Sequence, residues 1–302
     1  MPPEQPPVTI VDTFAEAFDM HAARVVITAR SAEWARTAAT AMTGFATSVI
    51  GCKLEAGIEA ELPPGDTPDG RPGISVLLFA FNAEGLASRL VDRIGQTVLT
   101  CPTTACYDGL PQAATRVAVG GILRHFGDRL QSSKFLDGRR YWRVPVMDGE
   151  FLVEDTFGVQ PAIGGGNLLI LAVDQEAALT AAQAAVDAMR AVRGVILPFP
   201  GGMVRSGSKV GAKRYKKMSA STNDAYCPTV RGRIGVESQL PESVNAVLEI
   251  VVDGLDRQAI EMALRAGLAA ARRPGVVQIS AGNYGGRLGK HHFRLHELLA
   301  GR

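Results

Sequence analysis

The sequence predicts an α+β fold made of two duplicated lobes that pack together. The 302 residues are 46% hydrophobic and 21% charged, so the chain can bury a sizeable core and divide into two domains. The segment VDTF at residues 11–14 is matched by EDTF at 154–157, and a similar apolar run followed by an Ala-rich helical pattern comes twelve residues after the Thr of each. A shift of 143 residues superimposes the two stretches, which indicates an internal duplication.

The first half reads as strand, helix, strand, strand, helix, strand. Short apolar runs predict the strands, and longer Ala-rich periodic stretches predict the helices. A Pro/Gly-rich connection, LPPGDTPDGRPG, separates the two β-rich parts. The predicted elements are a strand over 25–28, a helix over 31–42, strands over 47–52 and 74–79, a helix over 83–94 and a strand over 96–101.

The second half repeats this order. Its predicted elements are a strand over 168–173, a helix over 175–192, strands over 194–199 and 246–252, a helix over 256–272 and a strand over 276–280. Each half therefore matches the split βαβ, ferredoxin-like unit of order βαββαβ. We place the N-terminal lobe, with a strand-and-loop link over 102–150, at residues 1–148 and the C-terminal lobe at 149–302.

A long insertion interrupts the second half at about residues 200–245. Connections of this length are usually functional or disordered, and apolar and aromatic residues spaced among the small ones argue against disorder throughout. Within it, SASTNDAYCPTV at 219–230 is rich in side chains that form hydrogen bonds. The stretch predicts either a ligand-binding loop or a polar turn, because such residues also favour turns for local reasons.

The segment GGMVRSGSKVGAK at 201–213 resembles a phosphate-binding loop but does not match its pattern. The lysine that should follow Gly207 directly comes one position late, at Lys209, and no Ser or Thr follows it. A Gly/Ser-rich loop whose backbone approaches a ligand stays open. The nearby Lys and Arg residues indicate either a solvated surface or a site for an anionic substrate tail.

Glu249 is the candidate proton-transfer residue. In the strand NAVLEIVVDG, alternation places Glu249 on one face with Val247 and Val251. A carboxyl group held among apolar side chains can have a raised pKa and then donate or accept a proton near neutral pH. The alternative is a strand whose Glu points into water.

The remaining composition excludes several classes of protein. The net charge of +2 gives no reason to expect a nucleic-acid partner. The four cysteines form no C-x-x-C pair, so we expect free thiols, and His292-x-x-x-His296 has no partner at metal-site spacing. No signal peptide and no apolar stretch long enough to cross a membrane is present, so we expect a cytoplasmic protein with no membrane association.

Several long motifs occur in one order along nearly the whole chain: VDTFAEAF, TGFATSVI, DGRPG, GEFLVEDTFG, PFPGGMVRSGSKVG, STNDAYCPTV, PGVVQISAGNYGGRLG and RLHEL. With these motifs the sequence closely resembles the formylmethanofuran:tetrahydromethanopterin formyltransferase family. The resemblance implies a two-lobed α/β protein of ferredoxin-like halves, assembled as a homotetramer. It also implies transfer of a formyl group between the amine of methanofuran and N5 of tetrahydromethanopterin, the two cosubstrates, with no metal or prosthetic group.

The resemblance places the catalytic carboxylate of the family on Glu249. Formyl transfer needs orientation, hydrogen-bond donors for an oxyanion and a proton shuttle, which hydroxyls, amides and glycine N–H groups can supply. We expect the substrate pocket to be formed by Ser48, Phe199, Pro200, Gly201, Gly202, Arg205, Ser206, Ser208, Lys209, Ser221, Thr222, Asn223, Asp224, Tyr226 and Cys227.

The balanced charge and the many Ala and Arg residues indicate a bacterial member, similar to the formyltransferase subunit of a formyltransferase/hydrolase complex. Its partners would be further copies of itself, an amidohydrolase-like hydrolase and accessory subunits, and transfer would run toward methanofuran. Two alternatives stay open. The chain could be a binding module or scaffold without activity, or Cys227 or a serine could carry the formyl group covalently.

Overall fold

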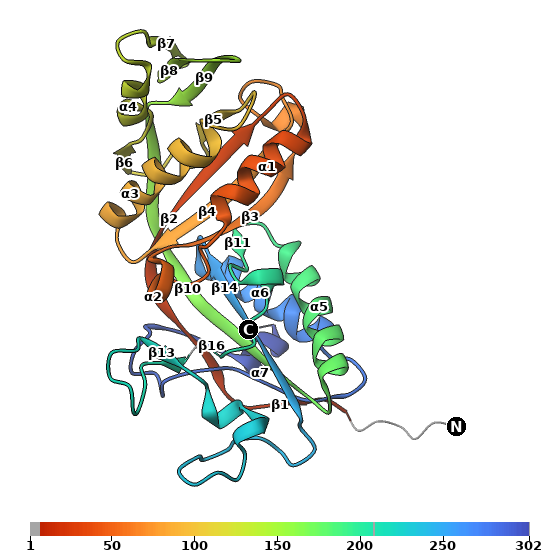
Figure 1. Cartoon of the computed structure of the whole chain (residues 1–302). Helices are drawn as coiled ribbons and strands as arrows, with labels where there is room; N and C mark the ends of the chain where they lie inside the picture. Colours follow the sequence, from red (N-terminus) through yellow and green to blue (C-terminus); the bar gives the residue numbers. More distant parts are fainter. Residues whose placement is uncertain (1–6, 208, 302) are drawn as a thin grey trace. The chain divides into compact units, whose positions relative to one another are not determined.

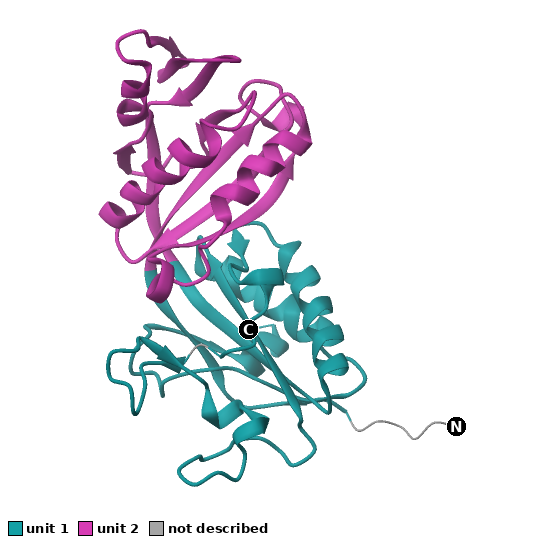
Figure 2. Cartoon of the chain, viewed as in Figure 1, with its two compact units in different colours: residues 1–19, 163–302 teal, residues 20–162 magenta. Residues whose placement is uncertain are grey.

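The structure is a computed structural model that describes residues 7–207 and 209–301 (Figure 1). It is a mixed α+β protein, as expected. The chain divides into two compact units, shown in Figure 2. Unit 1 comprises residues 1–19 and 163–302, and unit 2 comprises residues 20–162. Each boundary falls inside a long strand, β2 (Phe14–Thr28) or β10 (Thr156–Ala172).

Unit 2 is built on a sheet of order β3-β4-β2-β5. All three neighbouring pairs are antiparallel. Apolar side chains of helices α1 and α3 pack with those of β2 and β4 in one buried core. The main elements are α1 (Ala32–Thr43), α2 (Val49–Cys52), β3 (Glu55–Leu62), β4 (Gly73–Ala80), α3 (Ala83–Arg93) and β5 (Ala105–Asp108). They are followed by β6 (Thr115–Ala118), α4 (Gly120–Leu123), β7 (Ser132–Leu136), β8 (Arg139–Val146) and β9 (Gly149–Glu154).

Unit 1 has a sheet of order β11-β14-β10-β15, and again the neighbouring pairs are antiparallel. Helices α5 and α6 pack on one face of this sheet. The core elements are α5 (Gln175–Arg190), β11 (Val195–Ile196), β14 (Ala246–Gly254), α6 (Arg257–Ala270) and β15 (Val276–Ser280). The others are β1 (Thr9–Ile10), β12 (Lys209–Val210), β13 (Ala220–Ser221), β16 (His291–Arg294) and α7 (Leu295–Ala300).

Polar side chains begin the four long helices. Ser31, Asn82, Asp174 and Asp256 each accept a hydrogen bond from the backbone N–H three residues further on. Such contacts satisfy donors that have no partner within the helix. The four predicted helices are confirmed, with ends that differ by at most two residues.

Two predicted strands are wrong. Within 47–52, residues Val49–Cys52 form the short helix α2, because the Ser48 hydroxyl accepts from Ile50 N–H and caps the turn. Residues 96–101 continue the helix after α3 as a π-helical turn over Ile94–Val98. Their β-branched residues predicted a strand, but the hydroxyls of Thr97 and Thr100 bond back to carbonyls four residues earlier, which lets them remain helical. The predicted strand over 194–199 is also shorter, with only Val195–Ile196 paired.

In residues 7–207 and 209–301, every helix is too short or too polar to cross a membrane.

Candidate functional site

Glu249 lies in the middle of β14 and is 3% exposed. It pairs with Leu169 of β10 on one side and, through an isolated bridge, with Val204 of the insertion on the other. Val204 N–H donates to the Glu249 carbonyl at 2.7 Å, and Glu249 N–H donates to the Val204 carbonyl at 3.0 Å. The insertion is therefore joined to β14 by a one-residue bridge at the candidate carboxylate residue.

The sheet face that carries Glu249 is the one opposite α5 and α6. Leu169, its cross-strand neighbour, packs with Leu171 and Val244 and with the insertion residues Tyr226 and Leu240. The adjacent residues of β14 and β10 point to the helices instead. The insertion thus covers the Glu249 face of the unit 1 sheet, which keeps water from the carboxylate.

Two glycines hold the predicted Gly-rich loop in place. Gly202 has φ +84°, and a Cβ there would lie 2.9 Å from Val186 of α5. Gly207 has φ +74°, and a Cβ there would lie 2.5 Å from the Cβ of Asn223. The loop at 200–207 and the STNDAY stretch consequently lie against each other, at a distance that only glycine permits.

The polar part of the insertion is organised around Asp224. Its carboxylate binds the ammonium groups of Lys209 and Lys213, the latter at 3.0 Å. These two lysines lower the pKa of Asp224 to about 2. Lys209 also pairs through its backbone with Ser221, whose hydroxyl donates to the Gly211 carbonyl at 2.6 Å. Two cations share one carboxylate, so the cluster keeps a positive charge that suits an anionic group.

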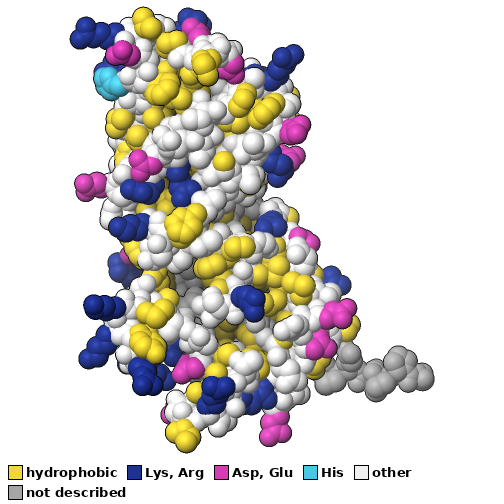
Figure 3. All heavy atoms as spheres, viewed as in Figure 1, with side chains coloured by type: hydrophobic (Ala, Val, Ile, Leu, Met, Phe, Trp, Pro, Cys, Tyr) yellow, Lys and Arg dark blue, Asp and Glu magenta, His cyan; other side chains and the backbone are white. Residues whose placement is uncertain are grey.

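Figure 3 shows Lys and Arg side chains gathered on unit 1 around the position of β13 in Figure 1. Of the expected pocket residues in the insertion, Phe199 is half-buried; the exposed ones are Pro200, Gly201, Arg205, Ser206 and Thr222. Tyr226 donates from its hydroxyl to Gln239 at 2.6 Å, and the Cys227 sulfur lies 3.1 Å from the Thr229 hydroxyl. Ser208 lies outside the described residues. Ser48 belongs to unit 2, where it caps α2.

Sequence reasoning missed Tyr284 and the turn that carries it, residues 282–289. The Tyr284 hydroxyl accepts from Val210 N–H at 3.3 Å, so the turn contacts the insertion. The pKa of the Tyr284 phenol is raised, mainly by burial and also by the charges of Glu249 and Glu16. The hydrogen bond from Val210 N–H acts in the opposite direction. The signal was present in the glycine-rich motif AGNYGGRLG directly after a strand, a pattern typical of a constrained loop.

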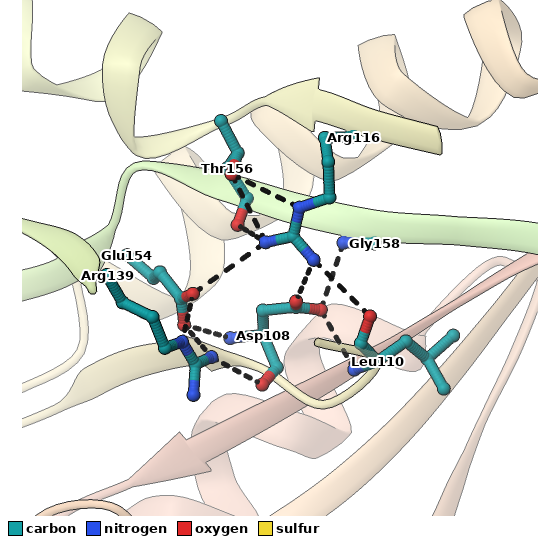
Figure 4. Close-up of polar contacts among 7 residues, drawn as sticks. All are labelled: Asp108, Leu110, Arg116, Arg139, Glu154, Thr156 and Gly158. Carbon is teal, nitrogen blue, oxygen red and sulfur yellow. Dashed lines mark hydrogen bonds and ion pairs between the residues drawn. The ribbon is translucent and has the colours of Figure 1, made fainter. Parts of the chain in front are cut away.

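A second polar cluster lies within unit 2 and lines a cavity of about 430 Å³. Figure 4 shows its arrangement. Asp108 accepts from the Arg116 guanidinium at 2.6 Å and from the N–H groups of Leu110 and Gly158 at 2.9 and 3.0 Å. Glu154 accepts from Asp108 N–H at 3.0 Å and from both Nε and Nη2 of Arg139.

Both oxygens of each of these carboxylates accept hydrogen bonds from the protein. Burial raises the pKa of Glu154, although Arg139 and the Asp108 N–H act against it. A saturated network of this kind joins β5, β6, β8, β9 and β10 of unit 2, and its donors and acceptors already satisfy one another. We assign it to stability rather than to chemistry.

The site in unit 1 therefore combines a buried carboxylate, a nearby phenol, a cationic cluster and glycine-rich backbone. These groups suit an enzyme that moves protons at a bound substrate with anionic parts, and the α+β fold presents them on one sheet face. Among the described residues, no group of three or more His, Cys, Asp or Glu side chains is placed to hold a metal ion.

Comparison with known proteins identifies the family. The model described as formylmethanofuran-tetrahydromethanopterin formyltransferase matches residues 4–146, and the one described as FTR, proximal lobe, matches residues 149–298. A formylmethanofuran–tetrahydromethanopterin formyltransferase from Methylobacillus flagellatus is 56% identical over 300 residues, 97% of this chain and 98% of that protein. A subunit of the formyltransferase/hydrolase complex from Methylorubrum extorquens is 53% identical over 302 residues, 97% of this chain and 96% of that protein.

Solved structures agree. A chain in the crystal structure of the formyltransferase/hydrolase complex from Methylorubrum extorquens, determined with methylofuran, superimposes with a TM-score of 0.92 at 52% identity and covers 96% of each chain. The formyltransferase from Methanosarcina barkeri gives a TM-score of 0.92 at 51% identity, over 97% of this chain and 98% of that one. The chain belongs to the formylmethanofuran–tetrahydromethanopterin formyltransferase family. Both the resemblance carried by the motifs and the formyl-transfer function it implies are confirmed.

Proposed function

We propose that this acyltransferase moves a formyl group directly between N5 of tetrahydromethanopterin and the amine of methanofuran, with Glu249 as the proton shuttle. The observation that carries the assignment is the burial of Glu249, 3% exposed, on the sheet face that the insertion covers. A carboxylate in this setting can take a proton from one amine and return it to the other.

The reaction needs both substrates at once. The acceptor nitrogen attacks the formyl carbon, its new N–C bond forms, and the carbonyl oxygen carries the negative charge of a tetrahedral intermediate. Glu249 accepts the proton that the attacking amine loses and donates it to the departing nitrogen as the old N–C bond breaks. Backbone N–H groups of the 200–207 loop and the hydroxyls of the insertion are the candidate donors to the oxyanion.

The pocket residues expected from the sequence serve as the substrate-binding part of this proposal. Lys209, Lys213 and Asp224 would hold an anionic tail of either substrate, because the cluster keeps a net positive charge. The transfer from formyl-tetrahydromethanopterin to methanofuran is our proposed direction. Neither substrate acts as a bound prosthetic group.

We further propose that the two halves are duplicated ferredoxin-like lobes, 1–148 and 149–302. Each sheet has the same order, with the element order βαββαβ around it. The two family models meet between residues 146 and 149, which supports the boundary. The cytoplasmic location stays a prediction from the sequence.

A homotetramer and a complex with a hydrolase and accessory subunits complete the proposal. The Methylorubrum relatives carry the name of a formyltransferase/hydrolase complex. Exposed apolar side chains in unit 2 support an interface there, because such groups in number usually mark contact surfaces. They are Ile122, Phe126, Leu130, Phe135, Leu136 and Met147.

The test is an assay of purified protein with no metal added, run from formyl-tetrahydromethanopterin to methanofuran and, in reverse, from formyl-methanofuran to tetrahydromethanopterin. Glu249→Gln keeps the shape of the side chain but removes the titratable proton, so turnover should fall by about 100-fold or more. Glu261→Gln is the control, since this half-buried residue of α6 pairs with Arg257 on the helix side of the sheet, away from Glu249. Full turnover by a folded Glu249→Gln protein would refute the role of Glu249, and absence of transfer by the wild type would favour the scaffold alternative.

A further inference from the structure

The carboxylate of Glu16, on β2, is 1% exposed, and both of its oxygens accept hydrogen bonds from backbone N–H groups. One oxygen accepts from the N–H groups of Tyr284 and Gly286 at 2.6 and 2.9 Å. The other accepts from those of Leu288 and Gly289 at 2.7 and 2.6 Å. Burial would raise the pKa of Glu16, but these four donors prevail and lower it, so the group stays ionised.

Four N–H groups of one turn that converge on a single buried carboxylate fix the backbone of that turn. Further contacts hold its start: Asn167 accepts from Gly282 N–H at 2.5 Å, and Asn283 donates to the Phe14 carbonyl at 3.1 Å. Without these contacts, a turn with two consecutive glycines at positive φ would sample many conformations.

Tyr284 is the side chain that this turn presents to the candidate site. Its hydroxyl contacts Val210 N–H, six residues after Val204, which is bridged to Glu249. Strand β15, which ends at Ser280 shortly before the turn, and β14 both pair with β10, and Leu169 of β10 lies between Ser280 and Glu249. The phenol therefore contacts the insertion, and Glu249 lies two strands away from the end of β15 in the same sheet.

We propose that Glu16 is a positioning residue for formyl transfer: it holds Tyr284 beside Glu249, where the phenol takes part in proton handling. This inference rests on the proposed function of Glu249. Glu16 itself does not meet the substrate, so its loss acts on turnover rather than on substrate binding.

The experiment is a double-mutant cycle on the whole protein, with kcat and KM measured separately. In Glu16→Gln the amide presents an NH2 group to two of the four N–H donors, and the turn loosens. We expect kcat to fall by roughly 10- to 100-fold, the scale of a small misplacement at a catalytic site, with KM within about threefold. The kcat of Tyr284→Phe should fall by about 100-fold. The double variant should be no slower than Tyr284→Phe alone, because both changes remove the same function.

Hydrogen exchange by mass spectrometry gives a second readout. The segment 284–289 should exchange faster in Glu16→Gln, with the rest of unit 1 unchanged. Asp256→Ala is the matched control, since it removes a carboxylate-to-backbone contact at the start of α6 on the opposite sheet face. It should lower stability but leave kcat unchanged.

The inference would be overturned if the double variant lost kcat by the product of the two single losses. It would also be overturned if Glu16→Gln showed faster exchange at 284–289 but a normal kcat. If instead Glu249→Gln retains full activity, the proposed function of Glu249 fails first, and the two failures are thereby distinguished.

Discussion

The Asp108 network in Figure 4 allows a stability prediction to be worked from its geometry. The Asp108 carboxylate is fully buried, and Arg116, its partner at 2.6 Å, is 30% exposed. In Asp108→Asn the remaining amide oxygen can still accept from Leu110 and Gly158 N–H, but the ion pair is lost and the amide NH2 faces the Arg116 guanidinium. Removing one partner of a buried pair costs about 3–5 kcal/mol. Arg116 keeps its contact to the Thr156 carbonyl and is partly hydrated. We therefore expect Asp108→Asn to lower the free energy of unfolding by about 3 kcal/mol, the smaller value of that range.

That loss corresponds to a Tm decrease of roughly 6–12 °C for a unit of this size. Calorimetry of both proteins measures it. Glu150→Gln in unit 2 is the matched control: its carboxylate lies at the same 2.6 Å from Arg143, but both side chains are about half exposed. An exposed pair contributes at most about 1 kcal/mol. If both variants lower Tm equally, burial of the Asp108 pair does not stabilise the protein and the reasoning is refuted.

Three further predictions concern the insertion. Lys209→Gln should raise the apparent KM, and added salt should weaken binding to wild type more than to this variant; equal salt dependence would make Lys209 ordinary surface. Cys227→Ala should keep substantial activity, and wild type incubated with labelled formyl donor alone should carry no bound label by mass spectrometry; stoichiometric label on the protein would establish a covalent route. The lowered pKa of Asp224 means that its contribution to stability is complete above its ordinary value of 3.8 and is lost as pH falls through about 2. Chemical unfolding should therefore show a deficit for Asp224→Asn at pH 5, below about 1 kcal/mol, that shrinks toward pH 2; a deficit independent of pH would contradict this.

Periodicity predicted the helices and most of the sheet, because apolar spacing is a local property that burial then confirms. It failed at residues 47–52 and 96–101, where side-chain hydroxyls bond to nearby backbone and keep β-branched residues helical. Propensity describes the side chain alone, whereas these outcomes depend on which backbone group lies within reach of a hydroxyl.

The candidate site was partly accessible from the sequence. Alternation along NAVLEIVV grouped Glu249 with Val247 and Val251 on one strand face, and in the structure Val247 packs with the insertion. Gly207 lies against Asn223. Glu16 and Tyr284 could not be paired in advance, since 268 residues separate them and nothing local links a strand residue to a distant turn. The role of the individual pocket residues stays a prediction.

The division of unit 1 into residues 1–19 and 163–302 has a consequence for biosynthesis. As the chain leaves the ribosome, unit 2 is complete once residue 162 has emerged, while β2 still lacks its partner β16 at His291–Arg294. At usual elongation rates that wait is on the order of tens of seconds. The buried carboxylate of Glu16 must therefore stay hydrated until the last part of the chain arrives with its four N–H donors. Unit 1 can then close only after residues 284–294 have emerged, so synthesis of this late segment is the step that completes the candidate site.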